Sequence, residues 1–174
     1  MSVKSVIKKK EITDKTENAI TEETDLLVLH NASCSKLSAR SQGKLDYQIG
    51  YSYLADQLYL RVLTNNSGGY FSKEWVPIAV INSSLDEVIL SGGAFTAPKL
   101  IPAFISKSQN NAGFLAAVLL AEGIIEKVVD RQHLLTLTKG GLKVWQAKWI
   151  KTAKGLSNQS GEKKESSPHR KQAG

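Results

Sequence analysis

The fold is decided by residues 112–141, which read AGFLAAVLLAEGIIEKVVDRQHLLTLTKGG. The first ten of them are almost all apolar and predict a helix that is buried on all sides. Gly123 stands where this helix should end, because glycine adopts the left-handed conformation of a C-cap without strain. Residues 124–129 and 133–138 then alternate as two antiparallel strands, with a polar tip at residues 130–132. The stretch therefore predicts a helix followed by a β-hairpin.

A shorter helix is predicted upstream, over residues 99–105, and the polar residues 106–111 separate it from the apolar helix. A short helix, a polar turn and a second helix follow the order of a helix-turn-helix. The hairpin adds further motifs, namely LLAEGII at residues 119–125, then Lys127, then Asp130-Arg131, and LTKGG at residues 137–141. In this order they resemble the winged helix-turn-helix family, and specifically the wing of MarR-type bacterial regulators. The resemblance covers about residues 97–150.

The resemblance implies a regulatory or accessory protein that binds double-stranded DNA. Helices that read bases normally expose Arg, Lys, Gln, Asn or Ser, because these side chains form the contacts that distinguish bases. Residues 112–121 offer none of them, so we expect mainly phosphate-backbone contacts with limited base readout. The residues expected to bind DNA are Lys107, Ser108, Gln109, Asn110, Asn111, Arg131, His133, Lys139 and Lys143.

The charge of the chain is concentrated at its C-terminal end. The formal net charge is +7, residues 1–138 hold 14 basic and 14 acidic side chains, and residues 139–174 hold 9 basic and 2 acidic ones. Residues 141–156 predict an amphipathic helix, since an apolar stripe recurs every three or four residues and most lysines lie off it. The lysines are interpreted either as a solvated face or as a phosphate-binding surface, and a membrane-surface helix is a third possibility. A homodimer through this helix is also expected. The stripe consists of Leu142, Trp145, Trp149, Ala153 and Leu156.

The N-terminal half predicts a small sheet. Residues 45–51 and 58–64 alternate apolar with polar side chains, which is typical of an antiparallel hairpin with one face on a core. Residues 26–29 fit either a buried strand or the end of a helix. Residues 78–90 predict a helix, with a strand over residues 75–81 as the alternative, and residues 91–93 end the element in both cases.

Together these patterns predict an α+β fold, with an N-terminal antiparallel β-hairpin subdomain, a winged helix-turn-helix and a C-terminal amphipathic helix. The expected divisions are a flexible charged arm (1–24), an α+β subdomain (25–93), a winged-helix domain (94–156) and a disordered basic tail (157–174). The longest apolar run has ten residues, about half of what crosses a bilayer, so we expect a cytoplasmic protein without a membrane partner.

Catalytic residues are sparse, so we expect no enzyme, no cofactor and no metal site. The histidines are His30, His133 and His169, and none has a second ligand at metal-binding spacing. His30 lies four residues before Cys34, the single cysteine, but a small structural cysteine is the favoured interpretation. The alternative to DNA binding is a protein-interaction module, an adaptor or an inhibitor, that uses a winged helix as its framework.

Overall fold

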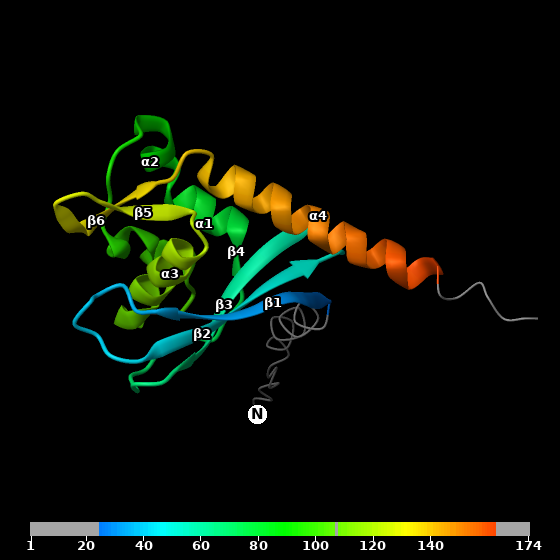
Figure 1. The fold of residues 1–174 in the computed structure, drawn as a ribbon, viewed down its shortest axis with the longest axis horizontal. Coiled ribbons are helices and arrows are strands. Elements are labelled where there is room, and N and C mark those ends of the chain that lie inside the picture. The colour runs from blue at the N-terminus through cyan, green and yellow to red at the C-terminus, as the bar shows by residue number, and fades with distance from the viewer. Residues whose placement is uncertain (1–24, 107, 163–174) are drawn as a thin grey trace, which may run out of the picture.

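The computed structural model describes residues 25–106 and 108–162, with side chains up to residue 157. It has a mixed α+β fold. A four-stranded antiparallel sheet packs against the helices, and a separate two-stranded sheet packs on the same core (Figure 1). The expected arm over residues 1–24 lies outside the described residues. The elements are β1 (Leu26–Ser35), β2 (Lys44–Ser52), β3 (Gln57–Asn65), β4 (Val76–Pro77), α1 (Ile78–Ser84), α2 (Asp86–Ser91), the 3-10 helix η1 (Ala97–Ala103), α3 (Gln109–Ala121), β5 (Ile125–Val128), β6 (Arg131–Leu137) and α4 (Gly141–Glu162).

β2 and β3 form the hairpin predicted over residues 45–64. Leu45 pairs with Asn65 at the open end, and Tyr51 pairs with Leu58 beside the turn. Because successive side chains point to opposite faces of a strand, the apolar positions of both strands enter the core. Asp56 closes the turn at φ 47°, and the Tyr51 hydroxyl donates a hydrogen bond to its carboxylate.

The ambiguous apolar run at residues 26–29 begins a strand. The ten-residue strand β1 pairs antiparallel with β2 at nine positions, with a bulge between Val28 and His30. The N-terminal sheet is therefore larger than the predicted hairpin, and its strand order is β1-β2-β3-β4. The loop that joins β1 to β2, residues 36–43, lies at one end of this sheet.

The helix predicted over residues 78–90 is broken into two. Leu85 adopts φ −109° and ψ 5°, outside the helical region, and its side chain is fully buried. Ser83 and Ser84 precede the break, and serine favours helix ends because it competes for backbone hydrogen bonds. Gly92 ends α2 in the left-handed conformation, as predicted. The alternative strand over residues 75–81 is reduced to the two residues of β4.

The segment that follows contains η1, α3 and the β5–β6 hairpin in the predicted order. α3 begins three residues earlier than the predicted residue 112, because Ser108 caps it by accepting a hydrogen bond from the amide of Asn110. Phe95 forms an isolated antiparallel bridge with Leu135 of β6. Gly123 follows α3 at φ 69°, which agrees with the predicted C-cap.

The tip of the β5–β6 hairpin is tighter than predicted. Val128 pairs with Arg131, so the turn consists of Val129 and Asp130 rather than residues 130–132. Asp130 has φ 62°, a conformation that aspartate tolerates better than most side chains. Arg131 consequently belongs to β6.

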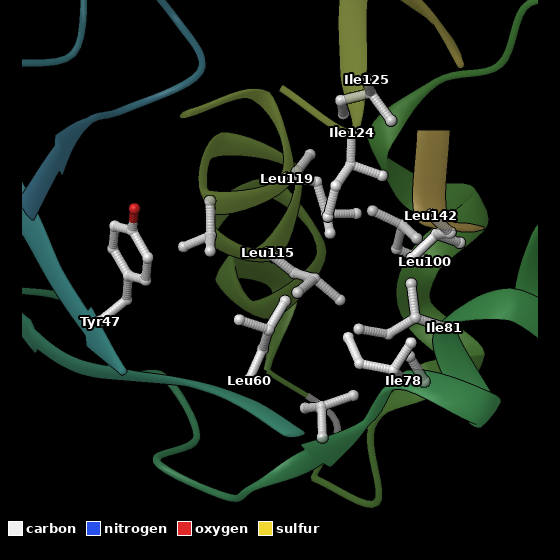
Figure 2. Packing of buried hydrophobic residues seen from close by; sticks show 14 of the residues in the cluster. Tyr47, Leu60, Ile78, Ile81, Leu100, Leu115, Leu119, Ile124, Ile125 and Leu142 are labelled. Carbon is white, nitrogen blue, oxygen red and sulfur yellow. The ribbon is translucent and has the colours of Figure 1, made fainter. Parts of the chain in front are cut away.

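Helix α3 lies at the centre of one cluster of buried apolar side chains. Figure 2 shows Leu115 of α3 directed between Leu60 of β3 and Ile81 of α1. The predicted stripe of α4 is buried at Leu142, Trp145, Trp149 and Ala153. Leu156 is 43% exposed, because α4 continues beyond the sheet (Figure 1).

Helix α4 extends to Glu162, so residues 157–162 are helical and do not belong to a disordered tail as predicted. The Ser157 hydroxyl donates to the carbonyl of Lys154 within this helix. The rest of the predicted tail, residues 163–174, lies outside the described residues.

Glu122 links the sheet to α3 and α4. Its carboxylate accepts hydrogen bonds from the Tyr47 hydroxyl of β2 and from the Trp145 indole nitrogen of α4, the latter at 2.8 Å. Burial and the hydrogen bond to Glu122 raise the pKa of Tyr47 well above its usual range. Burial, together with the charges of Glu122 and Asp46, raises the pKa of the Cys34 thiol to about 11.

Candidate nucleic-acid interface

A hollow of about 1000 Å³ opens between two projecting segments. One wall is formed by residues 36–41 of the β1–β2 loop, and the other by Lys127 and residues 130–133 of the β5–β6 hairpin. The floor consists of residues 96–98 at the start of η1 together with residues 109, 110, 113 and 114 of α3. Figure 1 shows the loop and the hairpin tip on the same side of the molecule, with α3 between them. We call this space the basic hollow.

The charges that line the basic hollow are mostly positive. Lys36 and Arg40 lie on the loop wall, Lys127 and Arg131 lie on the hairpin wall, and Asp130 is the one carboxylate among the described lining residues. The salt bridge within the described part of the chain joins Lys99 to Glu87, so it occupies none of these four cations. Two cationic walls that face each other attract a polyanion, because clefts lined by one sign of charge concentrate the electric field.

A hydrogen bond joins the loop wall to the neighbouring turn, and a cation–π contact joins it to the floor. The Lys36 ammonium donates to the Ser67 hydroxyl and lies 5.5 Å from the centre of the Phe114 ring. The Ser108 hydroxyl and the Asn110 side-chain amide both donate to the carbonyl of Tyr70, at 2.7 and 2.8 Å. The first turn of α3 is thus held against the segment that follows β3.

The structure brings four of the predicted DNA-binding residues together. Gln109 and Asn110 lie on the floor of the basic hollow, and Arg131 and His133 lie on its hairpin wall. Ser108 is the half-buried cap of α3.

Asn111 has an internal role instead. It is 3% exposed, accepts a hydrogen bond from the amide of Ser72 at 2.9 Å and donates one to the carbonyl of Ser106 at 3.1 Å. These bonds anchor the segment before β4 to the start of α3. The sequence could not distinguish Asn111 from Asn110, because the two identical residues differ only in the direction that the helix gives them.

The remaining predicted residues do not line the basic hollow. Lys107 lies outside the described residues, and Lys139 is exposed just before α4. Lys143 lines a separate hollow of about 340 Å³ between α2 and the start of α4. The other lysines of α4 lie along a helix that runs away from the β5–β6 hairpin (Figure 1). Lys148 packs 4.7 Å from the centre of the Trp149 ring.

The body of α3 is enclosed, as its composition predicted. Residues 111, 112 and 114–119 are all buried, so the helix cannot project along a DNA groove. Its exposed amides near the hollow are those of Gln109 and Asn110. An amide can form paired hydrogen bonds with a base edge, but two such groups give limited discrimination.

Sequence reasoning missed Lys36 and Arg40. Residues 36–42 are small and polar, and nothing in their composition placed them opposite a hairpin some ninety residues later in the chain. The available signal was two cations within a run of small residues. Their proximity to Arg131 follows from the packing of α3 against β1 and β3.

The pair formed by Cys34 and His30 does not resemble an activated nucleophile. The Cys34 thiol has its pKa raised by burial, whereas catalytic thiols have a lowered pKa. The His30 ring instead packs 5.2 Å from the Trp149 ring. The described residues contain no group of three or more His, Cys, Asp or Glu side chains with the geometry to hold a metal ion.

Within residues 25–106 and 108–162, no helix has the length and apolar character needed to span a membrane. Comparison of the chain with models of known families, with curated proteins and with solved structures found no match.

Proposed function

We propose that the protein binds DNA through the basic hollow and acts as a regulatory or accessory factor. The observation that carries this proposal is the convergence of Lys36, Arg40, Lys127 and Arg131 on two facing walls, with one carboxylate among them. Lysine and arginine that line a DNA-binding surface neutralise phosphates and release counterions, which is the main source of sequence-independent affinity.

The order of the elements around the hollow supports the same proposal. The elements from residue 78 to residue 137 follow the order of a winged helix. They are the helices α1 and α2, the bridging residue Phe95, η1, α3 and the β5–β6 hairpin. In this arrangement the hairpin is the wing, and Arg131 reaches toward the DNA backbone. The β1–β2 loop is an addition from outside the winged-helix segment.

The proposed binding mode depends mainly on phosphates. The four cations hold the backbone, and Gln109 and Asn110 contact base edges where the strand passes over the first turn of α3. We therefore expect affinity that depends weakly on sequence and strongly on salt.

Fluorescence anisotropy with a labelled DNA fragment tests the proposal. Arg40→Ala and Arg131→Ala, one on each wall, should each weaken binding on the order of three- to tenfold at low salt, because each removes one phosphate contact. Lys151→Ala is the matched control, since Lys151 is exposed on α4 and carries the same charge. Loss of affinity in the control alone, or no binding even at low ionic strength, would reject the hollow as the DNA site.

A protein-interaction role is the second candidate, favoured by the burial of α3, which leaves few groups for reading bases. Exposed apolar side chains lie in α2, at Leu90 (88%), and between η1 and α3, at Ile105 (92%). A stable protein complex recovered by pull-down, together with no affinity for DNA, would favour this candidate.

A homodimer through α4 is a separate proposal. Val144 is 65% and Leu156 is 43% exposed on that helix, which leaves apolar surface for a second copy. Sedimentation of the wild type against Leu156→Lys tests it, with dimer lost in the variant as the expected result.

A further inference from the structure

The enclosed position of α3 limits which form of nucleic acid can use the basic hollow. Reading a duplex in the usual way requires an element that enters the major groove, about 12 Å wide and 8.5 Å deep. The body of α3 is buried, and its exposed first turn lies below two walls. A duplex therefore cannot receive the body of α3 in its major groove, which leaves the cations of the two walls as its main contacts.

We propose that the basic hollow binds an unpaired strand, whose phosphates contact the two walls and whose bases lie on the floor. This inference rests on the proposed function and specifies its ligand as single-stranded nucleic acid. A volume of about 1000 Å³ lies at the upper end of the range of about 300–1,000 Å³ for pockets that enclose small ligands. Such a space admits a few nucleotides of one strand.

The floor has the chemistry that bases require. Exposed Pro98 gives it an apolar surface, whereas the Phe114 ring is 9% exposed and lies 5.5 Å from the Lys36 ammonium. Gln109 adds a side-chain amide that has no hydrogen bond within the described residues. Nonspecific single-strand sites combine a cationic groove with flat apolar or aromatic surfaces on which bases stack. An acidic peptide would match the walls but would make little use of this floor.

Gly113 keeps the floor open. It lies inside α3, where glycine is less favourable than alanine, and its φ is not in the left-handed region. Apart from the backbone of its own helix turn, a Cβ atom at this position would meet no atom within 4 Å, so the packing of the described residues does not require glycine. The glycine exposes the helix backbone to the hollow, where a flat base can approach it closely.

Three oligonucleotides of one sequence test the proposal with the full chain, namely a single strand, a blunt duplex and a duplex with a single-stranded tail. A length of about 12 nucleotides lies within the site sizes of about 4–16 nucleotides known for single-strand-binding domains. We expect the single strand and the tailed duplex to bind about tenfold more tightly than the blunt duplex, because only they place bases on the floor.

Two variants test whether the floor is used. Gly113→Leu fills the hollow without removing a charge, and it should weaken single-strand binding at least tenfold while changing blunt-duplex binding less than twofold. Gly155→Leu is the matched control, because Gly155 is an exposed glycine inside α4 that does not line the hollow and whose Cβ position is also open. It should stay within twofold of the wild type for both ligands.

The possible outcomes separate this inference from the proposed function. Equal affinity for the single strand and the blunt duplex, with Arg131→Ala still weakening both, would overturn the inference and leave DNA binding intact. Displacement of the bound strand by polyglutamate, with no affinity difference among the three oligonucleotides, would also overturn it. Failure of every oligonucleotide to bind at low salt would remove both proposals. The comparison of oligonucleotides uses the wild type, so it decides the matter even if Gly113→Leu does not fold.

Discussion

Replacing Glu122 by alanine should cost a large part of the stability of the protein. Its carboxylate accepts hydrogen bonds from two donors, the Tyr47 hydroxyl and the Trp145 indole nitrogen, on residues that are 4% and 5% exposed. A buried donor left without a partner costs about 1–3 kcal/mol, so the two together predict a loss of about 2–6 kcal/mol. The total stability of a domain is typically about 5–15 kcal/mol.

Urea denaturation followed by circular dichroism measures this loss, and two variants calibrate it. Glu122→Gln keeps one acceptor oxygen and should lose about half as much as the alanine variant. Glu126→Ala removes an exposed carboxylate of β5 and should change the unfolding free energy by less than about 0.5 kcal/mol. A loss for Glu122→Ala no larger than that for Glu126→Ala would refute the conclusion that this carboxylate links the sheet to the helices.

Two further predictions concern salt and pH. Four phosphate contacts predict a slope of about −2.8 for the logarithm of single-strand affinity against the logarithm of salt concentration, which is about a 50-fold loss between about 50 and 200 mM salt. A slope near zero in anisotropy titrations would contradict phosphate binding by the four cations. The raised pKa of Tyr47 predicts that its contribution to stability is fully present below the unfolded-state pKa of about 10 and is lost as pH rises above it, because the unfolded chain ionises first. Urea unfolding of the wild type and of Tyr47→Phe between pH 8 and pH 11 measures this, and parallel curves would be inconsistent with the shift.

The elements that could be predicted from the sequence are those whose patterns have a period. Alternation identified the hairpin of β2 and β3, and the three-to-four-residue stripe identified the face of α4 that carries Trp145 and Trp149. In both cases the buried face is determined by the geometry of a single element. The enclosed state of α3 was also predictable, since nearly all of its side chains are apolar.

The features that could not be predicted depend on contacts between distant segments. The predicted helix is interrupted at Leu85, although the propensity of leucine itself is helical. Arg40 lines the same hollow as Arg131 because the sheet packs on α3. No local sequence pattern predicts this packing of the sheet on α3. The count of charged residues pointed to the lysines after residue 138. The four cations that line the basic hollow all lie before residue 139, where basic and acidic side chains are equal in number.

Amide hydrogen exchange, measured with and without a saturating single-stranded oligonucleotide, shows where on the protein the ligand binds. We expect slower exchange in residues 36–41 and 127–133, the two walls of the basic hollow, and unchanged exchange in residues 148–157 of α4. The walls belong to segments far apart in the sequence, so their joint protection would locate the ligand between them. Protection confined to α4, with both walls unchanged, would contradict the account and return the binding surface to the C-terminal lysines.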